Sequence, residues 1–182
     1  MSCETLECYE DIALSDKNIF DLLEGKVSIV LYPDLHKYNN IDELLGNNGA
    51  CILLFEAKPH YGHWCAIIKL NERLIEFFDP YGTATTGGHP DDNLKHIPLE
   101  YAKVSNKREP FLSILMDKSP YNLSFNEIQF QRKDKKIGTC GRHCVFRIIN
   151  KDLSLYKYAD MMNVLCQSFK DDYDGVVTLF TI

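Results

Sequence analysis

The sequence predicts an α+β domain in which a central helix packs on a mixed, mostly antiparallel sheet. Residues 50–55 form a continuous apolar run of strand length, which is typical of a strand covered on both faces. Two further apolar runs, residues 64–70 and 74–79, are separated only by a polar turn and therefore predict an antiparallel hairpin. Residues 145–149, Val-Phe-Arg-Ile-Ile, have the composition of a buried helix, and we expect that helix to begin near residue 140.

The other elements follow from capping and turn residues. Ser15 and Gly25 fit the two ends of a helix near residues 16–24, and Pro110 fits the start of another helix. The turn-rich stretch at 82–96 predicts a long surface loop; its Gly87-Gly88 pair raises a self-cleavage hypothesis, although an ordinary turn is the simpler interpretation. We also expect a strand at 27–31, helical turns at 41–45, an alternating strand at 123–131, a helix after Ser154 and a final strand at 176–182.

Length, charge and cysteine usage limit the class of protein. A chain of 182 residues is expected to form one domain, residues 1–182, that buries roughly 70% of its unfolded surface. The formal net charge of -6 argues against nucleic-acid binding as the main role. Three of the seven cysteines, Cys51, Cys65 and Cys166, lie in apolar runs, which predicts buried free thiols in a reducing compartment. The first residues do not resemble a signal peptide, and no apolar stretch is long enough to span a membrane, so we expect a protein that is not secreted.

Cys140 is the candidate nucleophile. It stands at the expected start of the central helix, where the helix dipole places about half a positive charge. Such a position lowers the pKa of a thiol, whose ordinary value is about 8.5, and the thiolate is the nucleophilic form. Gly141, which has no side chain, would let a substrate backbone approach closely.

His63 and Asp79 are the candidate base and its orienting acid. His63 precedes the first strand of the predicted hairpin, and Asp79 closes the second. In an antiparallel hairpin the start of one strand faces the end of the other, so the two side chains should lie side by side. A carboxylate in that place fixes the tautomer of the imidazole and stabilises its charged form.

An acyl-transfer site also needs donors for the developing oxyanion. The backbone N–H of Cys140, free at a helix start, is one candidate. A glutamine amide would be the second, and both Gln131 and Gln129 lie on the same face of the strand expected at 123–131. Gln131 is the nearer of the two in sequence, and Gln129 stays open.

These residues together resemble a known protease family. The order His, Asp, Gln, Cys occurs here in Gly62-His63-Trp64, in residues 77–82 (Phe-Phe-Asp-Pro-Tyr-Gly), in Gln131 and in residues 140–144 (Cys-Gly-Arg-His-Cys). This order is similar to that of the adenain-type cysteine proteases, the maturation proteases of adenoviruses, related large DNA viruses, virophages and polinton-like elements. That family shares a fold with the SUMO and ubiquitin-like deconjugating proteases. The resemblance covers roughly residues 40–182.

The resemblance implies a papain-like fold and assigns the site. Cys140 would be the nucleophile, His63 the general base, Asp79 the orienting acid and Gln131 the oxyanion donor, with Trp64 as an aromatic wall beside the base. It implies a catalytic core at 41–182, preceded by a segment, 1–40, of uncertain role. No metal or organic cofactor is implied.

The resemblance also implies a class of substrate. The expected activity is an endopeptidase that cleaves after small residues, often glycine, in viral capsid or other structural precursors. Deconjugation of a ubiquitin-like protein is the alternative, and a catalytically dead binding module for such a protein is the second alternative. We expect a monomer in the cytoplasm of the host cell, which could be packaged in the virion, with no membrane contact.

Two further interpretations concern metals and charge. A zinc site could use His60, His63, Cys140, His143 and Cys144, but the Cys-x3-Cys and His-x2-His spacings are imperfect for a zinc finger.

The basic residues at 132–136 interrupt an otherwise acidic chain. The simple interpretation is a solvated loop, and the alternative is a weak contact with DNA or an acidic activator. The basic residues concerned are Arg132, Lys133, Lys135 and Lys136.

Overall fold

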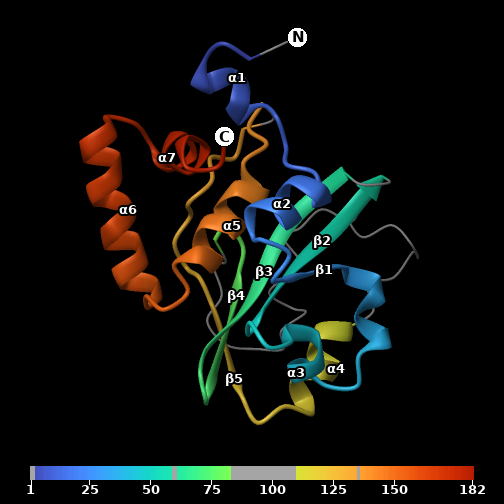
Figure 1. Ribbon diagram of the computed structural model, residues 1–182. Coiled ribbons are helices and arrows are strands. Elements are labelled where there is room, and N and C mark those ends of the chain that lie inside the picture. Colours follow the sequence, from blue (N-terminus) through green and yellow to red (C-terminus); the bar gives the residue numbers. More distant parts are fainter. Residues whose placement is uncertain (1–2, 59–60, 83–109, 135) are drawn as a thin grey trace.

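The computed structural model describes residues 3–58, 61–82, 110–134 and 136–182, and the whole is drawn in Figure 1. The predicted loop at 82–96, apart from Gly82, and its Gly87-Gly88 pair lie outside these residues. In chain order the described elements are α1 Leu6–Glu10, α2 Asp16–Leu22, β1 Ser28–Leu31, the 3-10 helix η1 Tyr32–Lys37, α3 Ile41–Leu45, β2 Ala50–Lys58, β3 Tyr61–Asn71, β4 Leu74–Phe78, α4 Phe111–Asp117, β5 Asn122–Phe125, α5 Cys140–Ile149, α6 Leu155–Phe169 and α7 Tyr173–Leu179.

Five strands form one mixed sheet in the order β1-β2-β3-β4-β5. The central strands β2, β3 and β4 pair antiparallel through the two longest registers, while β1 and β5 add parallel at the edges. The predicted mixed sheet and its β3–β4 hairpin are confirmed, and so are the predicted helices that begin near residues 16, 41, 110, 140 and 154. Ser15 caps α2 through a reciprocal pair of hydrogen bonds with Asn18, as its position before an apolar stripe predicts.

Helices cover both faces of the sheet, which explains why residues 50–55 of β2 are all apolar. On one face Ile52 and Leu54 pack under α5, with α6 and α7 outside it. On the other face Cys51, Leu53 and Phe55 pack against η1, α3 and α4. Because successive side chains of a strand point to opposite faces, a two-sided core requires this unbroken apolar run. The α+β class with a central helix on the sheet is therefore confirmed (Figure 1).

A buried ion pair ties the central helix to the sheet. Arg147 donates from Nε to Glu76 Oε1 at 2.9 Å and from Nη2 to Glu76 Oε2 at 2.8 Å. Both side chains are almost fully buried. Arg147 also donates to the carbonyl oxygens of Asn150 and Leu153 and lies over the ring of Tyr158. Sequence reasoning placed Arg147 within an apolar helix and did not identify this partner.

The predicted strand at 176–182 is wrong, because most of that stretch lies in helix α7. Asp172 caps the helix by accepting the backbone N–H of Gly175 at 3.0 Å. Val176 and Val177 are buried in the core beside α5. Packing of this apolar turn therefore overrides the strand preference of its β-branched residues.

The predicted strand at 123–131 is correct only over β5. After Phe125 the chain leaves the sheet, and the buried Asn126 side chain donates to the carbonyl oxygens of Asp79 and Ile128. An asparagine that satisfies backbone groups in this way offers the chain an alternative to the strand ladder.

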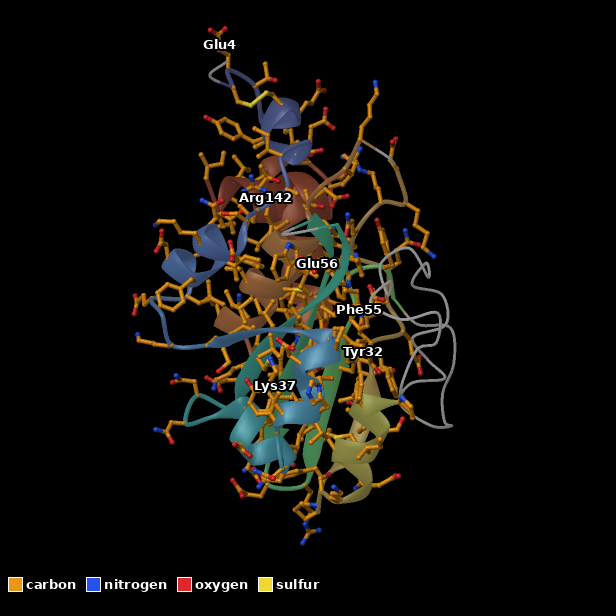
Figure 2. The ribbon with its side chains drawn as sticks, turned by 90° about the vertical axis from the view of Figure 1, so that its right-hand side faces the viewer. Glu4, Tyr32, Lys37, Phe55, Glu56 and Arg142 are labelled. Carbon is orange, nitrogen blue, oxygen red and sulfur yellow. A yellow bond between two sulfur atoms is a disulfide. The ribbon has the colours of Figure 1, made fainter. Side chains whose placement is uncertain are left out.

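The cysteines are free except for one pair in the N-terminal segment. Cys51 and Cys65 are buried free thiols, as predicted, whereas Cys166, also predicted to be buried, is a free thiol that is only half-buried. Cys140 and Cys144 are buried free thiols as well. Cys3 and Cys8, however, form a disulfide next to helix α1, contrary to the expectation that the chain carries free thiols (Figure 2). Cys3 precedes α1 and Cys8 lies within it, so their pairing depends on local backbone geometry that the count of cysteines does not reveal.

Candidate active site

Cys140 is the first residue of α5, as predicted. Thr139 is the N-cap, and every residue from Cys140 to Ile148 is buried. Gly141 lies under the N-terminal segment: a Cβ atom at this position would meet the side chains of Ile19 and Leu14 at 3.1 and 3.3 Å. In this structure the absence of a side chain at Gly141 thus allows close packing within the fold.

His63 and Asp79 meet as the hairpin register requires. His63 lies near the start of β3 and Asp79 directly follows β4, with Ala66 opposite Phe78 in the register between them. His63 Nε2 lies 2.9 Å from Asp79 Oδ1, and both side chains are buried. The expected juxtaposition of the two side chains is confirmed.

Two residues that sequence reasoning missed hold this pair in place. The ring of Tyr81 stacks on the imidazole of His63 with centroids 4.7 Å apart and planes 6° apart, and its backbone N–H donates to Asp79 Oδ1 at 2.9 Å. Asn126 Oδ1 accepts the backbone N–H of Asp79 at 2.8 Å, and its amide donates to the carbonyl of the same residue at 2.6 Å. Tyr81 was visible in sequence as part of the motif that follows Asp79, whereas Asn126 carried no signal.

The thiol of Cys140 is hydrogen-bonded to the imidazole of His63. Burial lowers the pKa of His63, but the charge of the Asp79 carboxylate and the hydrogen bonds of the imidazole with Asp79 and Cys140 outweigh it, so that the pKa of His63 is raised well above its ordinary value. Cys140, His63 and Asp79 are therefore connected in one line of hydrogen bonds although 77 positions separate the first two in sequence. This is the arrangement of nucleophile, base and orienting group that nucleophilic catalysis requires.

Cys65 lies beside the same imidazole. Its sulfur, His63 and Asp79 Oδ offer ligand atoms within 4.8 Å of one another, one of two such groups in the described part of the chain. Burial raises the pKa of the Cys65 thiol to about 12, and the Asp79 carboxylate raises it further while His63 lowers it. A metal ligand must be a thiolate, so a neutral Cys65 thiol is poorly suited to hold an ion.

The alternative zinc set is not assembled among the described residues. His143 Nε2 instead bonds Asp174 Oδ1 at 2.9 Å, and Cys144 Sγ donates to the carbonyl of Trp64 at 3.4 Å. His60 lies outside the residues that the structure describes. The other members of the proposed set are Cys140, His143 and Cys144. In the described part of the chain none of them lies with His63 in a group that could hold a metal.

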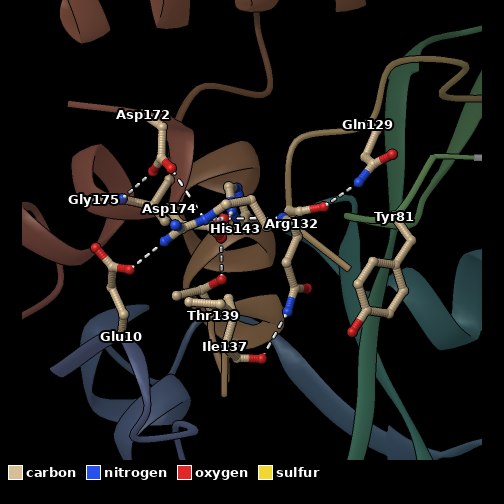
Figure 3. Close-up of polar contacts among 12 residues, drawn as sticks. Glu10, Tyr81, Gln129, Arg132, Ile137, Thr139, His143, Asp172, Asp174 and Gly175 are labelled. Carbon is tan, nitrogen blue, oxygen red and sulfur yellow. Dashed lines mark hydrogen bonds and ion pairs between the residues drawn. The ribbon is translucent and has the colours of Figure 1, made fainter. Parts of the chain in front are cut away.

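The two glutamines differ in their surroundings. Gln131 is buried, and its amide donates to the carbonyl of Ile137 at 3.2 Å, whereas Gln129 is exposed and donates to the carbonyl of Gln131 at 2.8 Å (Figure 3). The backbone N–H of Gln131 also donates to the carbonyl of Pro80 at 2.9 Å. Gln131 thus lies between the turn that follows Asp79 and the segment that leads to Cys140, which favours it over Gln129 as the second oxyanion donor.

Trp64 lies between the site and a small apolar cavity. Its indole N–H donates to the carbonyl of Leu14 at 3.2 Å, and its ring would meet a Cβ atom at Gly141 at 3.2 Å. A cavity of about 160 Å³ begins at Trp64 and is lined further by Asp16, Ile29, Val30, Leu31, Leu54 and Glu56. Trp64 therefore contacts both the start of the nucleophile helix and this cavity.

A second cluster of charged residues, also missed in sequence, surrounds the loop that precedes Cys140. Arg132 donates from Nη2 to Glu10 at 2.5 Å and from Nε to Asp172 and Asp174 at 3.0 and 3.1 Å (Figure 3). Asp174 is fully buried and also bonds His143. One of the basic residues at 132–136 is thus balanced by acids of the same chain, while Lys133 and Lys136 are exposed.

Comparison with known proteins places the chain in a family. It is 46% identical over 177 residues to the uncharacterized protein V9 of Sputnik virophage, an alignment that covers 97% of this chain and 98% of V9. The chain belongs to the V9 family. No protein-family model matches it. Because V9 is uncharacterized, membership in its family shows kinship with a virophage protein and supplies no activity.

One solved structure shows a distant likeness to this V9-family chain. The ASFV pS273R protease superposes with a TM-score of 0.49 and 15% sequence identity over 96% of this chain and 68% of that one. A likeness at this level carries no argument about activity. No helix in the described part of the chain is long and apolar enough to cross a membrane.

Proposed function

We propose that this V9-family protein is a cysteine endopeptidase of the adenain type with a papain-like fold. The observation that carries the proposal is the line Cys140–His63–Asp79, in which a thiol at a helix start is hydrogen-bonded to an imidazole that is also bonded to a buried carboxylate. In a cysteine protease these three groups act as the thiol nucleophile, the residue that transfers protons and the acid that orients it.

The reaction follows from these positions. Cys140 as the thiolate adds to the scissile carbonyl carbon, and the oxyanion that forms is stabilised by the Cys140 N–H and the Gln131 amide. As the C–N bond breaks, the His63 imidazolium gives its proton to the leaving amine and a thioester remains. Water then loses a proton to His63 and attacks the thioester, which releases the acid and restores the thiolate.

The substrates we propose are viral structural precursors cleaved after small residues, often glycine. Kinship with a virophage protein supports this choice over the deconjugation of a ubiquitin-like protein. The enzyme would act as a monomer in the host cytoplasm or the virion, with Trp64 beside the bound peptide. A contact of the exposed Lys133 and Lys136 with DNA or an acidic activator is part of the same proposal.

The test compares the protein with two matched variants. Cys140→Ala should abolish cleavage of capsid precursors and of peptides with a scissile bond after glycine, while Cys166→Ala, which removes a half-buried thiol elsewhere, should leave it unchanged. New N-termini identified by mass spectrometry give the cleavage site. Cleavage of SUMO or ubiquitin fusions alone would replace the maturation role by deconjugation. Binding of either class without cleavage would favour the dead module, and equal activity of Cys140→Ala would refute the protease.

A further inference from the structure

We propose that Asp174 is a positioning residue that sets the oxyanion site by holding both ends of the segment between Gln131 and Cys140. The inference rests on the proposed function, since it concerns how the two oxyanion donors keep their relative place. Asp174 itself lies in the first turn of α7, and no role in contact with a substrate is assigned to it.

One carboxylate binds both ends of this segment. Asp174 Oδ2 accepts the backbone N–H of Arg132, the residue after Gln131, at 2.9 Å. Asp174 Oδ1 accepts the hydroxyl of Thr139, the residue before Cys140 (Figure 3). Gln131 and Cys140 would carry the two oxyanion donors. Each is therefore next in sequence to a residue that is hydrogen-bonded to Asp174.

The same carboxylate also contacts the nucleophile helix α5, through His143. His143, one turn after Cys140 on α5, bonds Asp174 Oδ1 at 2.9 Å, and its Nδ1 has no hydrogen-bond partner among the described residues. The bond to Asp174 is thus the hydrogen bond that the His143 ring makes among the described residues. A segment of eight residues joins Gln131 to Cys140, so without a common anchor its two ends could shift independently.

The anchor is charged and rigid. Asp174 is fully buried, and burial raises its pKa, but the hydrogen bonds from His143 and Thr139 and from the backbone of Arg132 outweigh this and lower the pKa below its ordinary value. Hydrogen bonds to a charged acceptor are about twice as strong as those between neutral groups. A misplacement of about 1 Å costs an active site about 10²-fold in rate, so a single charged anchor at both ends would have a measurable effect.

The line Cys140–His63–Asp79 is not part of this anchor. Asp79 is held instead by Asn126 and Tyr81. Loss of Asp174 should therefore impair oxyanion stabilisation while leaving the nucleophile and its base in contact. Reaction of the thiol with iodoacetamide forms no oxyanion and so reports on the nucleophile alone, whereas hydrolysis of a glycine p-nitrophenyl ester requires both.

The experiment measures both reactions on the full chain. Asp174→Asn keeps the volume of the side chain but reduces its number of hydrogen-bond acceptors. In this variant kcat for the p-nitrophenyl ester of benzyloxycarbonylglycine should fall by about 10- to 100-fold. That loss is smaller than the loss of about 10²–10³ seen when an oxyanion donor is removed outright. KM, and the rate and pH profile of Cys140 alkylation by iodoacetamide, should stay within about twofold. Thr139→Val should lower kcat in the same selective way, and Thr139→Ser, which keeps the hydroxyl, should restore it.

Asp172→Asn is the matched control. It removes an acid that also contacts Arg132 but keeps an equally good N-cap for α7, so kcat should not change. A parallel loss of alkylation and hydrolysis in Asp174→Asn and Thr139→Val would overturn the inference, because it would show a structural role only. Unchanged kcat in both would also overturn it. Failure of the unmodified protein to hydrolyse the ester, or equal hydrolysis by Cys140→Ala, would instead refute the proposed function.

Discussion

The buried pair between Glu76 and Arg147 gives a prediction that does not depend on the proposed function. Replacing Glu76 by Leu leaves a guanidinium that is almost fully buried without its carboxylate. Loss of one partner of a buried pair typically costs about 3–5 kcal/mol. In a chain of this size each kcal/mol lowers the melting temperature by about 2–4 °C, so the midpoint should fall by about 6–20 °C.

Replacing Arg147 instead should destabilise the fold more than replacing Glu76. Arg147→Met leaves the Glu76 carboxylate unpaired and also removes the donors to the carbonyl oxygens of Asn150 and Leu153 at 2.9 and 3.0 Å. Each orphaned carbonyl adds about 1–3 kcal/mol. The double variant, Glu76→Leu with Arg147→Met, buries no charge, so its free energy of unfolding should be lowered only by the two unpaired carbonyl oxygens.

Urea denaturation of the four proteins completes a double-mutant cycle. The double variant should be more stable than Arg147→Met alone, and the coupling between the two positions should reach several kcal/mol, which exceeds the usual range of about 0.5–3 kcal/mol for residues in contact. As a control, Asp21→Asn breaks an exposed pair with Lys17 and should leave the midpoint unchanged. Additive effects at Glu76 and Arg147 would refute the reasoning, because they would show that neither charge depends on the other.

Two further predictions concern the site itself. Gly141→Ala places a Cβ atom 3.1–3.3 Å from three side chains, so it should destabilise the fold by about 1–3 kcal/mol in thermal unfolding, and an unchanged midpoint would show that these neighbours move aside easily. Because the pKa of His63 is raised in the folded protein, its stabilising contribution is fully present below an unfolded pKa of about 6.5 and is lost as the pH rises through the folded value. The stability advantage of the unmodified protein over His63→Gln in urea should therefore shrink from pH 6 upward; an advantage that grows with pH would contradict the assigned shift.

Local patterns predicted most of the sheet and most of the helices. Residues 50–55 of strand β2 are all apolar because they are covered on both faces, and the hairpin β3–β4 is joined by a short polar turn. The pairing of His63 with Asp79 followed from that hairpin, because register between adjacent strands is determined by neighbours in sequence. The choice of Cys140 as its partner came from the helix start and the family resemblance.

The C-terminal helix could not be predicted in the same way. Acidic residues and a glycine before an apolar, β-branched run fit either a turn before a strand or the capped start of a helix. Asp172 caps helix α7, and Val176 and Val177 are buried beside α5. The decision between the two states depends on a surface for packing that only the folded chain supplies. Asp174, 35 positions from Thr139, was missed for the same reason.

The N-terminal segment is joined to the site more closely than the motif positions indicate. The carbonyl of Glu10 accepts the backbone N–H of Gly138 at 2.8 Å, and its carboxylate bonds Arg132. The carbonyl of Leu14 accepts the indole N–H of Trp64. Residues 10–14 therefore contact both the segment before the nucleophile and the aromatic residue beside the base. The predicted boundary between an N-terminal segment and a catalytic core was placed at residue 40, where the motifs begin. The residues that pack against the site begin about thirty positions earlier. They accept backbone and indole N–H groups through main-chain carbonyls, which any sequence can supply, so no motif marks them.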